Sequence, residues 1–80
     1  LSLTPVYADG AVRGLRVDGG ADQLSSLGLE PGDVVLSLNA APLTSEAAAV
    51  RAFALLDAAD MAVARVLRDG NEITVETSLR

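Results

Sequence analysis

The chain has 80 residues, half of them hydrophobic, and a formal net charge of −5. It contains no cysteine and no histidine, which excludes disulfides, thiolate metal sites and the usual general base. Six cationic residues face eleven acidic ones, and aromatic residues are scarce, so nucleic-acid binding is excluded as well. The length indicates one domain over residues 1–80, and no apolar run approaches the roughly 18 residues of a membrane-spanning helix.

The first elements predict a β-hairpin. Residues 1–7 are typical of an extended strand, and Pro5, which has no N–H to donate, indicates that this strand lies at the edge of a sheet. An Asp-Gly turn signal follows, and the return strand runs from Val12 to Val17.

Two further elements are predicted in the middle of the chain. A short helical turn spans residues 22–27, with Asp22 as its cap and Gly28 as the left-handed residue that ends it. A Pro-Gly-Asp corner then leads into residues 34–38, which are apolar almost throughout. Such a strand is covered on both faces.

The main helix is predicted from Ser45, its N-cap, to about residue 57, with an acidic residue in the first turn. Ala49, Ala52 and Leu56 share the side of this helix that we expect to face the core. The alanines raise helix propensity and allow a close approach to a sheet.

The end of the chain predicts a second hairpin. Residues 61–68 form one strand, an Asp-Gly turn follows, and residues 72–79 alternate between apolar and polar side chains. About five short strands and two helices in one domain indicate an α+β, mainly β fold, namely a small antiparallel β-barrel or sandwich capped by helices.

The segment Leu27–Asn39 carries the most specific pattern: a Gly-Leu step, a Gly-Asp corner and an apolar strand that ends in asparagine. In this pattern the sequence resembles a bacterial PDZ domain of permuted topology, over nearly the whole chain from about Val12 to Leu79. The resemblance implies a PDZ-like fold with a groove for a partner segment.

Among such domains the chain looks most like those of the type II secretion system protein C family, also called general secretion pathway protein C. The likeness rests on the strand Val12–Val17, the apolar strand that ends in Asn39, the Leu43-Thr44 helix start and the run Met61–Gly70. One departure is Ala40, where that family usually has glycine. The turn must then place a positive φ on Asn39 or adopt another type.

The resemblance implies a non-enzymatic interaction module in the periplasm. It would be the C-terminal domain of a longer protein, anchored in the inner membrane by a segment outside this chain. Its partners would be secreted proteins or other components of the secretion machinery, with no nucleic acid, cofactor or metal. The serines have no histidine or lysine to activate them, which agrees with a module that is not an enzyme.

Two alternatives remain open from the sequence. One is the regulatory peptide-binding PDZ domain of a periplasmic HtrA-type serine protease or of a site-2 protease. The other is a structural interaction domain whose groove is filled by its own helix or by a symmetric partner. The oligomeric state is not indicated.

In a PDZ domain a partner's extended segment adds beside one strand, and the main helix forms the opposite wall. The resemblance therefore assigns partner binding to Arg13, Gly14, Leu15, Arg16, Val17, Glu46, Val50 and Phe53. Val12–Val17 would be the free sheet edge, with Leu15 and Val17 as the floor and Gly14 admitting a partner backbone. A carboxyl terminus held near Arg13, an internal strand and a folded partner surface all remain open.

Overall fold

Strands β1 (Ser2–Ala8) and β2 (Ala11–Gly19) form the first hairpin of the computed structural model, which describes residues 2–19 and 27–79. Their turn places Asp9 at φ 52° and Gly10 at φ 81°, as a two-residue type I′ connection requires. This hairpin was predicted. The helical turn expected at residues 22–27 lies almost wholly outside the described residues.

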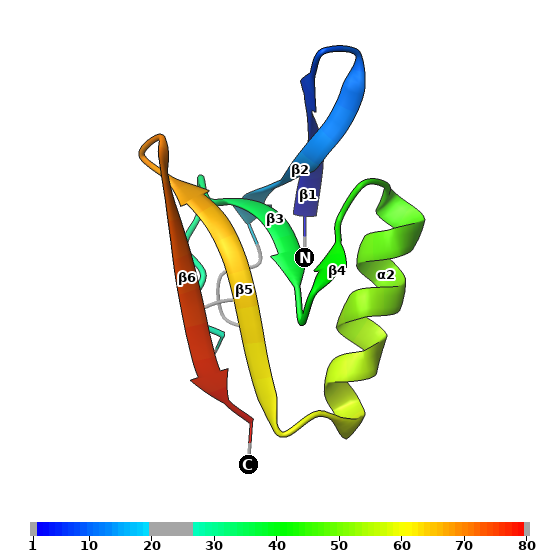
Figure 1. Ribbon diagram of the computed structural model, residues 1–80, viewed down its shortest axis with the longest axis vertical. Coiled ribbons are helices and arrows are strands. Elements are labelled where there is room, and N and C mark those ends of the chain that lie inside the picture. The colour runs from blue at the N-terminus through cyan, green and yellow to red at the C-terminus, as the bar shows by residue number, and fades with distance from the viewer. Residues whose placement is uncertain (1, 20–26, 80) are drawn as a thin grey trace.

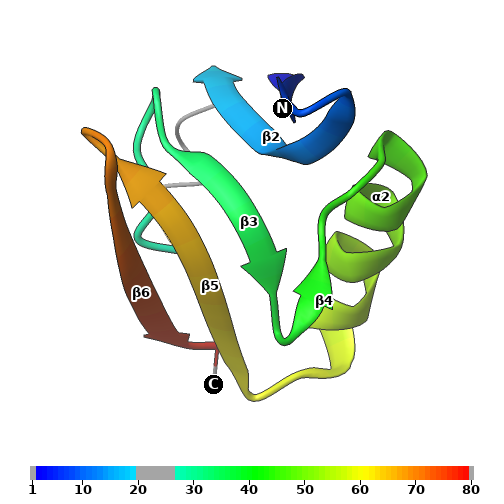
Figure 2. The ribbon, with the colours of Figure 1, turned by 45° about the horizontal axis from the view of Figure 1, so that its top comes forward.

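The other elements follow in chain order: β3 (Val34–Leu38), β4 (Ala41–Pro42), α2 (Glu46–Leu55), the 3₁₀ turn η1 (Leu56–Ala58), β5 (Met61–Arg68) and β6 (Asn71–Ser78). The strands form one antiparallel sheet in the order β1-β2-β3-β5-β6, with β4 paired to the end of β3 (Figure 1). The sheet curls, and α2 stands beside β4 at the side away from β6 (Figure 2). The predicted mainly β fold with a capping helix is confirmed, and β4 is an addition to it.

Helix α2 begins where its cap predicted. The Ser45 hydroxyl oxygen accepts the Ala48 N–H at 3.0 Å, which satisfies one amide of the first turn. Ala49 and Ala52 are 2% and 5% exposed, and Leu56 packs against the core. The predicted core face of this helix is therefore correct.

The core lies between the curled sheet and α2. Its buried hydrophobic residues are Leu15, Val17, Leu29, Val35, Leu38, Leu43, Ala49, Ala52, Ala62, Ala64 and Val66. Strands β2, β3 and β5 supply buried residues to it, and the outer strands β1 and β6 pack partly buried side chains such as Leu3, Ile73 and Val75 against it.

The turn between β3 and β4 has a positive φ at two non-glycine residues. Asn39 has a φ of 49° and Ala40 a φ of 68°. Asn39 is held there because its Nδ2 donates to the Met61 carbonyl at 3.0 Å and its Oδ1 accepts the Val63 N–H at 2.7 Å. The positive φ expected at Asn39 is confirmed, but Ala40 shares it, at a steric cost that glycine would avoid.

A partly buried ion pair fixes the corner before β3 to the end of β5. Arg68 donates from Nε to Asp33 Oδ1 at 2.9 Å and from Nη2 to Oδ2 at 2.7 Å, and the Glu30 backbone N–H reaches Oδ2 at 3.0 Å. Hydrogen bonding from Arg68 is the main cause that holds the pKa of Asp33, which is 2% exposed, below its usual value.

Candidate functional site

The strand predicted to be a free edge, Val12–Val17, lies inside the sheet. Strand β1 pairs with β2 over its whole length, and β3 pairs with Leu15 and Arg16 on the opposite side. The prediction of a free edge at Val12–Val17 is therefore wrong. The physical reason is that β1 occupies the position beside β2 that was expected to receive a partner strand.

The residues of this strand have internal roles. Leu15 and Val17 are each 1% exposed and belong to the core. A Cβ on Gly14 would lie 2.6 Å from the carbonyl oxygen of Val35, so this glycine admits the domain's own strand β3. That overturns the expectation that Gly14 leaves room for a partner backbone.

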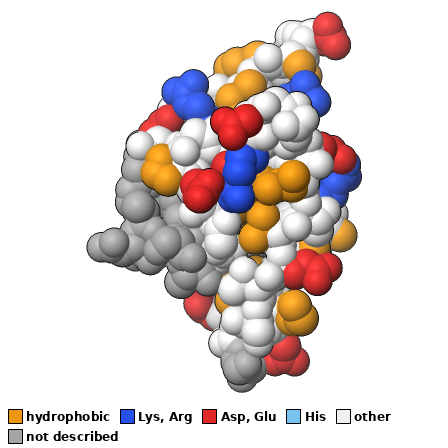
Figure 3. Space-filling model, turned by 90° about the vertical axis from the view of Figure 1, so that its left-hand side faces the viewer, with side chains coloured by type: hydrophobic (Ala, Val, Ile, Leu, Met, Phe, Trp, Pro, Cys, Tyr) orange, Lys and Arg blue, Asp and Glu red, His pale blue; other side chains and the backbone are white. Residues whose placement is uncertain are grey.

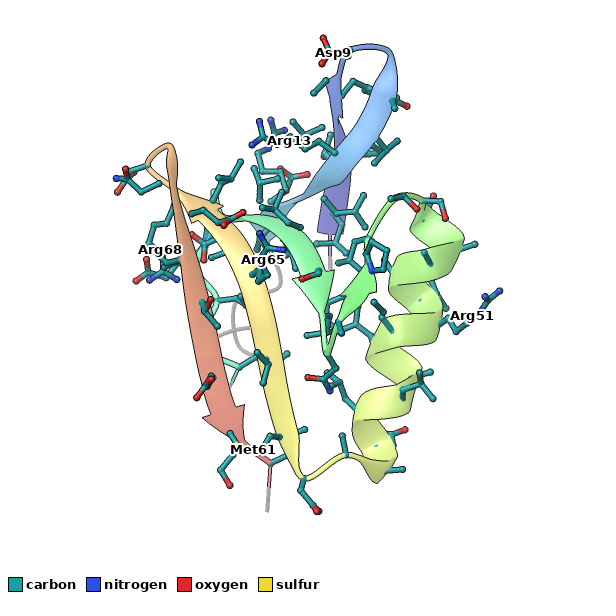
Figure 4. The ribbon with its side chains drawn as sticks, viewed as in Figure 1. Asp9, Arg13, Arg51, Met61, Arg65 and Arg68 are labelled. Carbon is teal, nitrogen blue, oxygen red and sulfur yellow. The ribbon has the colours of Figure 1, made fainter. Side chains whose placement is uncertain are left out.

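The two arginines of β2 also lie outside any groove beside the helix. Arg16 forms an ion pair with Asp18 at 2.8 Å. Thr4 donates a hydrogen bond to the same carboxylate, and these contacts, that of Thr4 first, lower the pKa of Asp18. Arg13 is exposed and lies on the side of the hairpin away from α2 (Figure 4). Its predicted contact with a terminal carboxylate gains no support from this position.

A groove with a volume of about 290 Å³ lies between the start of β1 and α2. Its lining residues are Leu3, Glu46, Ala49, Val50 and Phe53. Three of them, all on the helix, are among the predicted site residues, whereas Leu3 and Ala49 were not assigned to the site. The volume is close to the lower end of the range for ligand sites in proteins.

The helical wall of the groove is one stripe of α2. Glu46 lies three and four positions before Ala49 and Val50, and Phe53 lies four and three positions after them, which places all of them on one side of the helix. Ala49 is buried at the bottom of the stripe, and Val50 is 67% exposed beside it. Apart from the carboxylate of Glu46 the lining is apolar, so the groove presents hydrophobic surface that the domain leaves uncovered.

The opposite wall begins at the edge strand β1, as Pro5 predicted. The Val17 N–H donates to the Asp33 carbonyl, so the backbone groups of Val17 point toward β3. Successive residues of a strand point their N–H and C=O groups to opposite neighbours, and the backbone groups of Arg16 therefore point toward β1. Arg16 pairs with Thr4, so the backbone groups of Thr4 point inward to β2 and those of Pro5 point to the outer edge. Proline has no N–H, and at the outer edge no neighbouring strand requires one. Leu3 turns its backbone groups the same way, and no described strand pairs with that edge.

The far side of the sheet has a different character. The face that carries β6 shows charged side chains of both signs among small hydrophobic patches (Figure 3). Within residues 2–19 and 27–79, no cluster of acidic side chains suits a metal ion, and no helix is long and apolar enough to cross a membrane. The groove beside α2 is therefore the strongest candidate site of the described chain.

Comparison with known proteins identifies relatives through structure. No family model and no curated protein sequence matches the chain. The PDZ domain of EpsC from Vibrio cholerae superposes with a TM-score of 0.70 at 30% identity, covering 96% of this chain and 75% of that one. A shorter piece of the same domain gives a TM-score of 0.67 at 30% identity, with coverages of 98% and 92%.

A third solved structure comes from another bacterium. It is the PDZ domain of the pullulanase C protein of the type II secretion system of Klebsiella pneumoniae, in complex with a fatty acid. Its TM-score is 0.67 at 27% identity, and the match covers 98% of this chain and 82% of that one. PDZ domains are interaction modules rather than enzymes. Because both relatives match nearly the whole chain, in agreement with the pattern of Leu27–Asn39, the chain is a PDZ domain that belongs to the type II secretion system protein C family.

Proposed function

We propose that this PDZ domain binds a protein partner of the type II secretion apparatus in the groove between β1 and α2. The partner is a secreted protein or another component of the machinery. The observation that carries the proposal is the apolar groove beside the edge of β1, with which no described strand pairs. A strand edge and a helix wall are the two elements with which PDZ domains hold an extended segment.

The geometry supports a short and weak contact. A guest strand can pair with the backbone of Leu3, but Pro5 offers it only a carbonyl group, so the shared ladder is short. The guest's side chains would rest on Ala49, Val50 and Phe53, which offer little area. A module that hands on secreted proteins must release them, and a small interface of this kind suits that task.

The setting that we propose follows from the family. The domain, residues 1–80, lies in the periplasm as the C-terminal part of a protein that is anchored in the inner membrane by a segment outside this chain. Its six cationic and eleven acidic residues leave it strongly acidic, which agrees with a soluble module that does not adhere to anionic lipid.

The experiment is an NMR titration of the ¹⁵N-labelled domain with purified type II secretion substrates. We expect shifts at Leu3, Ala49 and Phe53, and their loss in Val50→Arg, because Val50 is 67% exposed and its replacement leaves the core intact. Leu55→Arg is the matched control: Leu55 is 64% exposed on the same helix but lines a different hollow, beside β4. Unchanged binding by Val50→Arg would refute the assignment of the groove.

An acyl chain is the second candidate for the groove. The Klebsiella pneumoniae relative was solved with a fatty acid, and four of the five side chains that line the groove here are apolar. Decanoate and its methyl ester, titrated separately, test this candidate. Shifts with both compounds at Leu3 and Phe53 support it, and their absence at concentrations below micelle formation excludes it.

A further inference from the structure

Among the described residues that line the groove, Glu46 is the one with a charged side chain. It is the first residue of α2 and is exposed. In the described part of the chain no cation forms an ion pair with it. Among the described residues, a guest in the groove therefore meets one negative charge that no cation offsets.

The described arginines are placed away from this charge. Three described arginines are bound by carboxylates: Arg16 by Asp18 at 2.8 Å, Arg65 by Glu72 at 2.6 Å and Arg68 by Asp33 at 2.7 Å. Arg51 lines the hollow beside β4 and points outward from α2 (Figure 4). Arg13 lies on the side of the β1–β2 hairpin that faces away from α2 (Figure 4). No described arginine is thus placed to neutralise an anionic guest.

The amino terminus of α2 offers little to an anion. The Ser45 hydroxyl oxygen already accepts the Ala48 N–H at 3.0 Å, and the Glu46 carboxylate itself interacts favourably with the positive end of the helix. A second carboxylate held in the groove would be repelled by Glu46, and the net charge of −5 adds to that repulsion at low salt.

The spacing of the wall matches that of an extended chain. Glu46 and Val50 are four residues apart on α2, about 6 Å along the axis. Side chains on one face of a strand repeat every two residues, about 6.6 Å. Resting on the proposed function, we propose that the groove selects an internal extended segment that carries lysine or arginine two residues from an apolar side chain, and that it disfavours a free carboxyl terminus.

The test uses blocked seven-residue peptides that carry leucine and, two positions away, lysine, glutamine or glutamate. Each is also made with a free carboxylate at its end. Binding to the wild-type domain is followed by NMR at Leu3, Ala49 and Phe53. We expect the lysine peptide to bind roughly 1.5- to 5-fold more tightly than the glutamine peptide at low salt, the range for one exposed ion pair. The free carboxylate should weaken each peptide.

A charge swap identifies the residue responsible. In Glu46→Lys the order of the peptides should reverse, whereas Glu76→Lys, which makes the same change of net charge on β6, should preserve it. In 1 M salt, the difference in affinity between the lysine and glutamine peptides and the effect of the free carboxylate should both become smaller. Equal affinities, or a preference for glutamate in the wild type, would overturn the charge selection while the shifts in the groove still support the proposed function. No shift in the groove with any peptide, together with secretion substrates that bind Val50→Arg normally, would overturn both.

Discussion

Replacing Ala40 with glycine should stabilise the domain. Ala40 is exposed and has a φ of 68°, which costs an L-residue about 1–2 kcal/mol. Glycine avoids that cost but loses about 0.5–1 kcal/mol more backbone entropy on folding. The net gain is about 0–1.5 kcal/mol, with a centre near 0.75 kcal/mol that corresponds to an increase in Tm of roughly 3–6 °C for a domain of this size.

The assay is urea unfolding followed by circular dichroism, together with thermal melts. The matched control is Ala54→Gly, an exposed alanine with a helical backbone in α2, which should lose up to about 1 kcal/mol. A higher urea midpoint at an unchanged m-value for Ala40→Gly and a lower midpoint for Ala54→Gly are expected. If Ala40→Gly loses stability in the same measurements, as Ala54→Gly does, the strained turn between β3 and β4 is refuted.

Three further predictions concern the core and the ion pair. Gly14→Ala should lose about 1–3 kcal/mol in urea unfolding, because its Cβ would meet the Val35 carbonyl oxygen at 2.6 Å; stability equal to wild type would contradict that contact. Leu15→Asp should fail to give a cooperative melt, since the Leu15 side chain is 1% exposed. An intact melt would contradict the assignment of Leu15 to the core and support its predicted place in the partner groove. Arg68→Met should lower the free energy of unfolding at pH 7, because Asp33 is 2% exposed and would lose its cationic partner. The pKa of Asp33 is lowered in the folded state, so the stability that Asp33 contributes is present above its unfolded pKa near 4 and is lost as the pH falls through its folded pKa. The difference in the free energy of unfolding between wild type and Arg68→Met should therefore narrow as the pH falls through that range. A difference that stays constant with pH would contradict the pairing.

Local signals predicted much of the fold. The Asp-Gly turns fix both hairpins, because their residues tolerate the positive φ that a short connection needs. Ser45 places the start of α2 because its hydroxyl group satisfies an amide of the first turn. Pro5 marks the edge strand because a missing N–H is tolerated only there.

The error in the predicted site was one of pairing. Alternation shows that Val12–Val17 is a strand, but which strands lie beside it is decided by the packing of the whole sheet. A glycine such as Gly14 signals that a backbone comes close, without showing whose backbone it is. Pro5 indicated only that the first strand lies at an edge, and that Leu3 lines the groove follows from the structure. The helix residues Glu46, Val50 and Phe53 do line the groove, and their contact with a partner stays a prediction.

The most direct measurement is a set of intermolecular NOEs between the labelled domain and a bound secretion substrate or a peptide from it. The account predicts NOEs to the methyl groups of Leu3 and Val50 and to the ring of Phe53. NOEs confined to the exposed side of β2, at Arg13 and Arg16, with none to α2, would contradict it.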